Sequence, residues 1–103
     1  MTVQPELAWI DQAIGHLNAT LASKNEDYRI DGEFSNFEFA GAIAGIHPLD
    51  VIVTQIGIKL GRLKGLANQP KNEARLDTLK DLAGYAVILY AYSLAEEEKN
   101  RGA

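Results

Sequence analysis

The chain contains no cysteine, and this absence excludes several kinds of chemistry. Without thiols there can be no disulfide framework, no thiolate nucleophile and no zinc–thiolate site, which fits a reducing compartment, so we expect a cytoplasmic protein. The two histidines, His16 and His47, lack the spacing of a histidine zinc site. No Ser or Thr lies in a strained, glycine-flanked turn beside a base, so we expect no catalytic triad.

Long apolar runs and an excess of positive charge are also missing. No stretch approaches the roughly 20 apolar residues that span a bilayer, and residues 1–10 lack a signal-peptide pattern, so no membrane partner is expected. The net charge of -4 at pH 7 is opposite in sign to the broad cationic surface of duplex-binding proteins. We therefore expect no duplex nucleic acid as a partner, although a local basic pocket is compatible with this charge.

The length of 103 residues predicts one domain over residues 1–103. A chain of this size leaves roughly a third of its unfolded surface exposed after folding. Association with further copies would stabilise it, so we expect a homo-oligomer.

The spacing of apolar residues predicts an all-α fold of four helices. In the N-terminal segment they recur at intervals of three and four, at Leu7, Ile10, Ile14, Leu17 and Leu21. This period predicts a helix over residues 6–23, with Pro5 suited to its first turn. Residues 25–35 have no period and contain Asp, Asn and Gly, so we expect a connecting loop there.

Local signals place the next two helices. Ser35 and Glu38 have the spacing of a capping box, in which both side chains bond to backbone amides at a helix start, and they predict a helix over residues 36–45. Pro48 then ends this helix and suits the first turn of another over residues 48–67.

The third helix is expected to be buried on two sides, because Val51, Val53 and Ile58 add a second apolar face. A fourth helix is predicted over residues 73–97 from apolar residues at Leu76, Leu79, Ala83, Ala86 and Tyr90. We expect Tyr90 to be a core residue, because it follows this spacing. The short connection between the last two helices predicts an antiparallel hairpin.

Glycines recur at intervals of four residues, at Gly57, Gly61 and Gly65, with a shorter pair at Gly41 and Gly45. Glycine costs about 1 kcal/mol relative to alanine inside a helix. Such a pattern favours close approach of another backbone, within a protomer or between protomers, and room for a ligand is the alternative.

Charged residues on the last two helices form the main candidate site. Lys59 and Arg62 share one helix face, and Asp77, Asp81 and Tyr85 follow one another at intervals of four. Folding the hairpin about its midpoint brings Lys59 near Lys80 and Asp81 and sets Arg62 opposite Asp77. The arrangement is either a pair of inter-helix salt bridges or a phosphate site in which the aspartates hold the cations or a metal. The sequence leaves both interpretations open.

Aromatic residues provide a second candidate feature. Asp27 and Tyr28 lie in the expected loop, Phe37 follows it, and Tyr85 lies on the fourth helix. The rings either cap the core or form a platform on which a base stacks, with polar edges from the loop.

Five short motifs resemble a family of short phage and prophage proteins of unassigned function. They are Asp27-Tyr28, Ser35-Asn36-Phe37, Pro48-Leu49-Asp50-Val51, Lys59-Leu60-Gly61-Arg62-Leu63, and Asp77 with Asp81-Leu82-Ala83-Gly84-Tyr85-Ala86. The last is the most specific. In that family a glycine usually follows the Asp-Tyr pair, where this chain has Arg29. The resemblance covers about residues 24–92 and adds Asn36 to the candidate ligand-binding residues.

More remotely, the chain looks similar to MazG-type nucleoside triphosphate pyrophosphatases, which hold magnesium with E-x-x-E and E-x-x-D pairs. That resemblance implies an enzyme in which Glu73, Asp77 and Asp81 bind Mg²⁺. The spacing here departs from the pattern, since Asp77 and Asp81 are four residues apart and the upstream acids form no E-x-x-E pair. The departure favours phosphate binding over hydrolysis.

The leading hypothesis is therefore capture of a nucleotide, linear or cyclic, without turnover and without a cofactor. Small phage proteins that sequester the cyclic nucleotide signals of bacterial defence systems are similar in kind, which implies a role in the host cytoplasm. The alternatives are the magnesium-dependent pyrophosphatase and a protein-interaction module with no small ligand.

Overall fold

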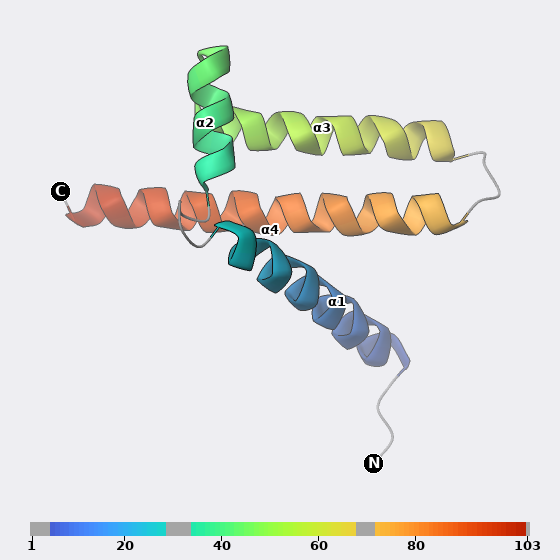
Figure 1. The fold of residues 1–103 in the computed structure, drawn as a ribbon. Helices are drawn as coiled ribbons and strands as arrows, with labels where there is room; N and C mark the ends of the chain where they lie inside the picture. Colours follow the sequence, from blue (N-terminus) through green and yellow to red (C-terminus); the bar gives the residue numbers. More distant parts are fainter. Residues whose placement is uncertain (1–4, 29–33, 68–71, 103) are drawn as a thin grey trace. The chain divides into compact units, whose positions relative to one another are not determined.

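The computed structural model describes residues 5–28, 34–67 and 72–102. These residues form four helices and no strand, which confirms the all-α class: α1 Pro5–Tyr28, α2 Ser35–Ala44, α3 Pro48–Leu66 and α4 Asn72–Gly102 (Figure 1). The chain divides into two compact units, Met1–Glu33 and Phe34–Ala103. Each is described separately below, and the single domain over residues 1–103 stays a prediction.

The first unit contains α1, which is longer than the sequence indicated. The helix runs to Tyr28 rather than ending at residue 23, so the predicted loop over residues 25–35 is wrong for residues 25–28. The hydroxyl of Thr20 donates a hydrogen bond to the carbonyl of His16 (3.0 Å). Such a bond satisfies a polar side chain without interrupting the helix.

In the second unit, α2 begins one residue before its predicted start. The helix starts at Ser35 with Phe34 as its N-cap, and no side chain bonds to the free amides there. The amides of Phe37 and Glu38 instead donate to the carbonyl of Phe34, at 3.1 and 3.0 Å. The predicted capping box is therefore wrong.

A tight corner joins α2 to α3, whose axes differ in direction by 96°. Gly45 ends α2 in the left-handed region at φ 72°, which is accessible to glycine at little cost. Gly41 lies under the corner, where an added Cβ would be 2.6 Å from the carbonyl oxygen of Ile46. The backbone approach predicted from glycine is present at Gly41. At Gly57, Gly61 and Gly65 an added Cβ would meet nothing within 4 Å.

α3 starts as predicted. Pro48 occupies its first turn, and Nδ1 of His47 accepts a hydrogen bond from the amide of Leu49 (3.1 Å). This bond satisfies one of the amides that an isolated helix start leaves free.

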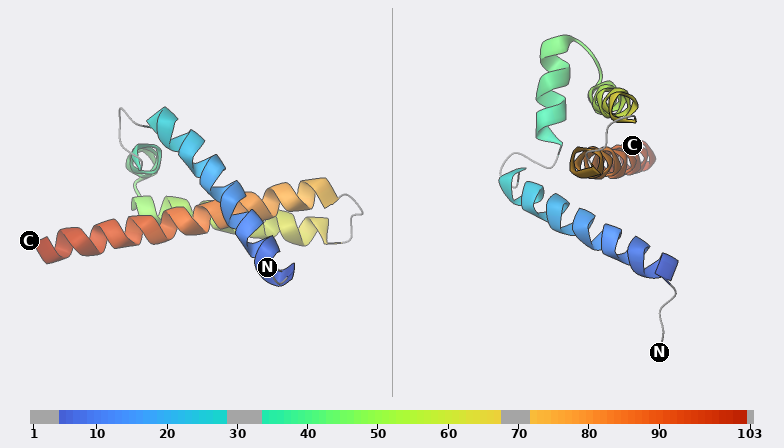
Figure 2. Two further views of the ribbon diagram at one scale, coloured as in Figure 1. Left: turned by 90° about the horizontal axis from the view of Figure 1, so that it is seen from below. Right: turned by 90° about the vertical axis from the view of Figure 1, so that its right-hand side faces the viewer.

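α3 lies alongside α4, and α2 packs on α3 (Figures 1 and 2). Within the described residues the most deeply buried side chains of this unit are Ile52, Thr78 and Tyr92. The hydroxyl of Thr78 donates to the carbonyl of Ala74 (2.8 Å), which lowers the cost of burying it.

Several apolar residues expected in the core are on the surface of the chain. Of the second face predicted for α3, Val53 and Ile58 are exposed and Val51 is half-buried, so the other described residues of this unit leave much of that face open. On α4, Leu76 and Leu79 are exposed and Tyr90 is 67% exposed, whereas Tyr92 is buried. The prediction that Tyr90 is a core residue is therefore wrong.

α4 extends to Gly102, five residues beyond its predicted end. The guanidinium of Arg101 contacts the carboxylate of Glu97 at 3.0 Å, one turn apart. Lys99 and Arg101 also lie in the last turn, where positive charge is favourable for a helix. Among the described residues, no individual helix has the length and apolar character needed to cross a membrane, while the bent pair α2 and α3 meets these criteria only jointly.

Candidate functional site

An ion pair between α3 and α4 lies at the centre of the candidate site. The ammonium nitrogen of Lys59 is 3.2 Å from a carboxylate oxygen of Asp81. The side chain of Lys59 is 18% exposed and that of Asp81 41% exposed. The predicted proximity of these two residues is confirmed. Since both remain partly open to solvent, a third charged group could reach the pair.

Arg62 and Asp77 lie one turn away from the ion pair, on α3 and α4 respectively. Both side chains are exposed. Arg62 forms no ion pair or hydrogen bond with any residue that the structure describes. The second salt bridge considered from the sequence is therefore not formed within the described chain. The guanidinium of Arg62 keeps its donors for a ligand or for water.

A pair of aromatic rings lies one turn further along α4. The rings of Phe37 on α2 and Tyr85 on α4 meet edge to face, with centroids 6.4 Å apart and planes at 79°. Tyr85 follows Asp81 by four residues and therefore shares its side of the helix. Three candidate groups that are distant in sequence, Lys59, Phe37 and the acidic face of α4, thus come together in one unit.

The remaining predicted site residues are not joined to this cluster by any described contact. Asn36 is exposed on α2, next to Phe37. Asp27 and Tyr28 end α1, in the other unit, and their side chains lie outside the described residues. The side chain of Glu73 also lies outside them. Their assignment to a site stays a prediction.

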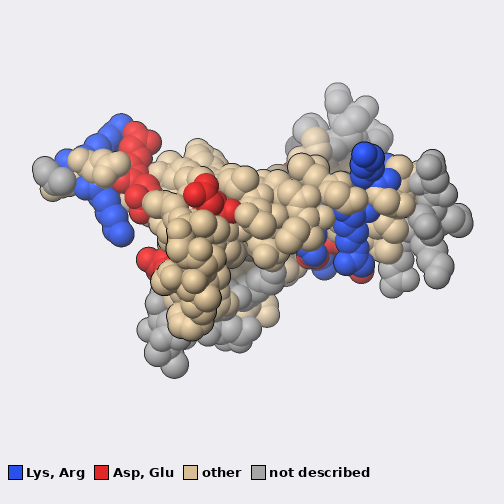
Figure 3. All heavy atoms as spheres, turned by 90° about the horizontal axis from the view of Figure 1, so that it is seen from above, with Lys and Arg blue, Asp and Glu red and all other residues tan. Residues whose placement is uncertain are grey.

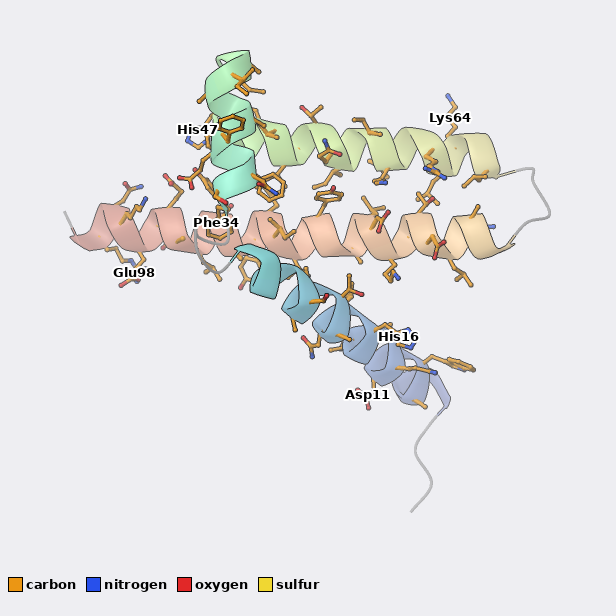
Figure 4. All side chains as sticks on the ribbon, in the orientation of Figure 1. Asp11, His16, Phe34, His47, Lys64 and Glu98 are labelled. Carbon is orange, nitrogen blue, oxygen red and sulfur yellow. The ribbon has the colours of Figure 1, made fainter. Side chains whose placement is uncertain are left out.

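A second aromatic cluster, which sequence reasoning missed, surrounds Tyr92. The ring of Phe34 lies 5.1 Å from that of Tyr92, and the ring of His47 lies 5.9 Å from it, both edge to face. Figure 4 labels Phe34 at the start of α2 and His47 at the start of α3. Desolvation raises the pKa of Tyr92, with further contributions from Glu96, by charge and hydrogen bonding, and from Glu38.

One sequence signal could have found this second cluster. Folding the hairpin about its midpoint sets Arg62 opposite Asp77, and the same register sets His47 opposite Tyr92. The register that pairs the charged residues therefore also implies the aromatic contact between His47 and Tyr92.

Basic residues outnumber acidic ones between the two members of the ion pair in the sequence, although the chain as a whole is acidic. Residues 59–81 contain six Lys and Arg residues and three Asp and Glu residues. Figure 3 shows a band of Lys and Arg atoms toward the C-terminal end of α3. Lys64 lies at this end and points away from α4, so it is not part of the candidate site (Figure 4). Lys59 and Arg62 are the cations that this site offers to an anionic ligand.

Metal-binding geometry is not found in the described part of the chain. No three or more His, Asp or Glu side chains among the described residues gather where they could hold a metal ion. Asp77 and Asp81 can contribute carboxylates only as a pair, with Asp81 already in contact with Lys59.

No protein-family model matches the chain, and no curated protein or solved structure shows significant similarity to it.

Proposed function

We propose that this chain binds a nucleotide, linear or cyclic, without turning it over. The observation that supports this most is the position of the Phe37–Tyr85 ring pair one turn along α4 from the Lys59–Asp81 ion pair. A nucleotide needs cations for its phosphate and aromatic or polar edges for its base. Neighbouring turns of one helix pair supply both.

Lys59 and Arg62 would bind the phosphate. An ammonium group has three donors, so Lys59 can keep its contact with Asp81 and still donate to a phosphate oxygen. Arg62 would add a two-pronged contact, because its planar guanidinium matches the geometry of phosphate oxygens. Asp77 would hold Arg62 in place or accept a hydrogen bond from the ribose.

The proposal places this site on an antiparallel hairpin of α3 and α4. Two contacts support that arrangement. Lys59 pairs with Asp81, and His47, twelve residues earlier, contacts Tyr92, eleven residues later. The partner of the earlier residue on α3 is thus the later residue on α4, and this is the pattern that antiparallel helices give.

The proposal favours capture over magnesium-dependent hydrolysis for an electrostatic reason. Magnesium in nucleotide enzymes is held by carboxylates that keep their negative charge available. Asp81 instead contacts a cation at 3.2 Å, which reduces its attraction for a metal ion. The pyrophosphatase alternative needs Glu73, Asp77 and Asp81 together and predicts cleaved products.

The proposed role is to sequester nucleotide signals, as the resemblance to short phage proteins implies. In that role the chain would work as a homo-oligomer in the host cytoplasm. Asn36, Asp27 and Tyr28 would complete the site on the strength of the motifs alone.

A thermal-shift screen against linear and cyclic nucleotides tests the proposal. A ligand at 100 times its dissociation constant should stabilise the folded state by about 2.7 kcal/mol. Mass spectrometry of the recovered ligand should show it intact. Mono- or diphosphate products in the presence of magnesium would favour the enzyme, and the absence of any shift would contradict nucleotide binding.

Arg62→Ala should abolish the shift while helicity is retained. Arg101→Ala is the matched control, because it removes the same charge from an exposed position at the far end of α4. If Arg62→Ala binds as well as Arg101→Ala does, Arg62 is not part of the site.

A protein-interaction module is the second candidate, and a separate observation favours it. Large apolar side chains are exposed on every described helix, among them Phe39, Ile58 and Tyr90. Monomeric proteins rarely leave extended apolar patches uncovered.

A further inference from the structure

The side of α4 that faces away from α3 carries a stripe of mostly apolar residues, interrupted by one lysine. Its large apolar members are exposed although α2 and α3 pack on the rest of the unit. Six positions at intervals of four and three define what we call the α4 stripe: Leu76, Lys80, Ala83, Val87, Tyr90 and Leu94. A helix rises about 1.5 Å per residue, so the stripe is about 27 Å long. Glu98, just beyond it, lies on the same side of α4 in Figure 4.

We propose that the α4 stripe pairs with the same stripe of a second copy of this chain, antiparallel and around a two-fold axis. The spacing of its positions, four, three, four, three and four, is the same in both directions. An interface between identical surfaces needs this self-complementarity. The glycine pattern in the sequence favoured close approach of another backbone at the glycine-bearing faces, whereas the exposure of α4 favours a different surface for assembly.

Residue sizes and charges match in the antiparallel register. With the axis near residue 85, Leu76 meets the partner's Leu94, and the small Ala83 meets the partner's Val87. Lys80 meets the partner's Tyr90, where an ammonium group over an aromatic ring gives a cation–π contact.

The charges at the two ends of the stripe are mixed in this register. Arg75 lies two positions from the point opposite the partner's Glu97, and position 73, which faces Glu97 directly, is also a glutamate. Parallel pairing would instead place Glu97 and Glu98 beside their own copies.

The paired arrangement leaves the candidate nucleotide site open. At 100° per residue, Asp81 lies roughly on the opposite side of α4 from Ala83 and the rest of the stripe. The inference therefore does not depend on the proposed function, and either one can fail alone.

Sedimentation velocity of the full chain over a concentration series tests the pairing. The mass of the wild-type assembly should be an even multiple of the chain mass of 11.3 kDa. Tyr90→Lys should halve the mass of the assembly, because the new lysine would face the partner's Lys80 and the two cations would repel each other. Phe39→Lys is the matched control, since Phe39 is an aromatic residue with a similar exposure of 70%. It should keep the wild-type mass.

Three results would overturn the inference. The first is a wild-type chain that is monomeric at all concentrations, which would mean that another element covers the stripe. The second is a Tyr90→Lys variant that keeps the wild-type mass while circular dichroism shows it folded. The third is a Phe39→Lys variant that dissociates as Tyr90→Lys does.

Cysteine cross-linking tests the direction, because the chain has no cysteine of its own. Leu76→Cys and Leu94→Cys should each give little disulfide-linked dimer alone and a linked heterodimer once the two are mixed and oxidised. Parallel pairing would instead link each variant to itself, and that result would refute the proposed register.

Discussion

The corner between α2 and α3 makes a sharp prediction about Gly41. A Cβ at this position would lie 2.6 Å from the carbonyl oxygen of Ile46 and 3.3 Å from the nitrogen of Pro48. Both are backbone atoms, so neither can rotate away as a flexible side chain could. Gly41→Ala must therefore displace the corner itself.

The expected effect of Gly41→Ala is a loss of about 1–2 kcal/mol of stability. Forcing one methyl group into a packed site typically costs about 1–3 kcal/mol. The higher helix propensity of alanine offsets up to about 1 kcal/mol of that cost. For a domain of this size the midpoint of thermal unfolding should fall by roughly 5–15 °C.

Gly57→Ala is the matched control, because it makes the same substitution in a helix where the added Cβ meets nothing within 4 Å. It should stabilise the chain by about 0.5–1 kcal/mol. Urea denaturation followed by circular dichroism, at one protein concentration, compares the two variants. If both substitutions stabilise equally, the tight corner at Gly41 is wrong.

Three further predictions, two of them with a control substitution, test the described packing. Ile52 is fully buried, so Ile52→Ala should cost about 2–5 kcal/mol in urea denaturation, whereas Ile58→Ala, at an exposed position, should cost under about 1 kcal/mol. The pKa of Tyr92 is raised in the folded state, so the protonated phenol contributes stability that is fully present below pH 10 and is lost as pH rises through the folded-state pKa. Tyr92→Phe should flatten this decline of the unfolding midpoint with pH in thermal scans, whereas Tyr90→Phe should not. His47→Ala removes the cap on Leu49 and should lower stability by about 0.5–2 kcal/mol, measured in the same denaturation assay.

The sequence predicted the helices best where a local chemical signal fixes them. Pro48 fixes the start of α3 because its ring pre-sets the backbone angle of a first turn, and the predicted end of that helix was wrong by one residue. The capping-box prediction was wrong because it depended only on the spacing of Ser35 and Glu38, which does not determine whether their side chains bond to the backbone amides. In the fold, the carbonyl of Phe34 accepts a hydrogen bond from the amide of Glu38, which the side chain of Ser35 was expected to satisfy.

Which face of α4 is buried could not be predicted from periodicity alone. The helix is apolar on more than one side, and the period identifies residues that share a face without showing which face a neighbour covers. Leu76 and Tyr90 follow the apolar period yet are exposed, while Thr78 and Tyr92 are buried. Burial of Thr78 is tolerated because its hydroxyl bonds to the carbonyl of Ala74.

The part of the candidate site that depends on the register between α3 and α4 could be predicted from the sequence. Counting from the midpoint of the last two helices brought Lys59 to Asp81, as the ion pair confirms. The contact between Phe37 and Tyr85 depends on how α2 turns across α3 and α4, and local sequence carries no information on that angle. A role in nucleotide binding stays a prediction for all four residues.

The distribution of apolar surface links the folding of this chain to its assembly. Among the described residues, Ile52 and Tyr92 form the buried apolar core. The stabilisation from so small a core is low compared with the conformational entropy that the chain loses when its helices become ordered. Pairing of the α4 stripe would stabilise the folded chain and not the unfolded one, so the unfolding midpoint should rise with protein concentration. Tyr90→Lys should remove this dependence of the unfolding midpoint on protein concentration. Arg62→Ala, which changes α3 and not the α4 stripe, should keep the dependence and abolish only ligand binding.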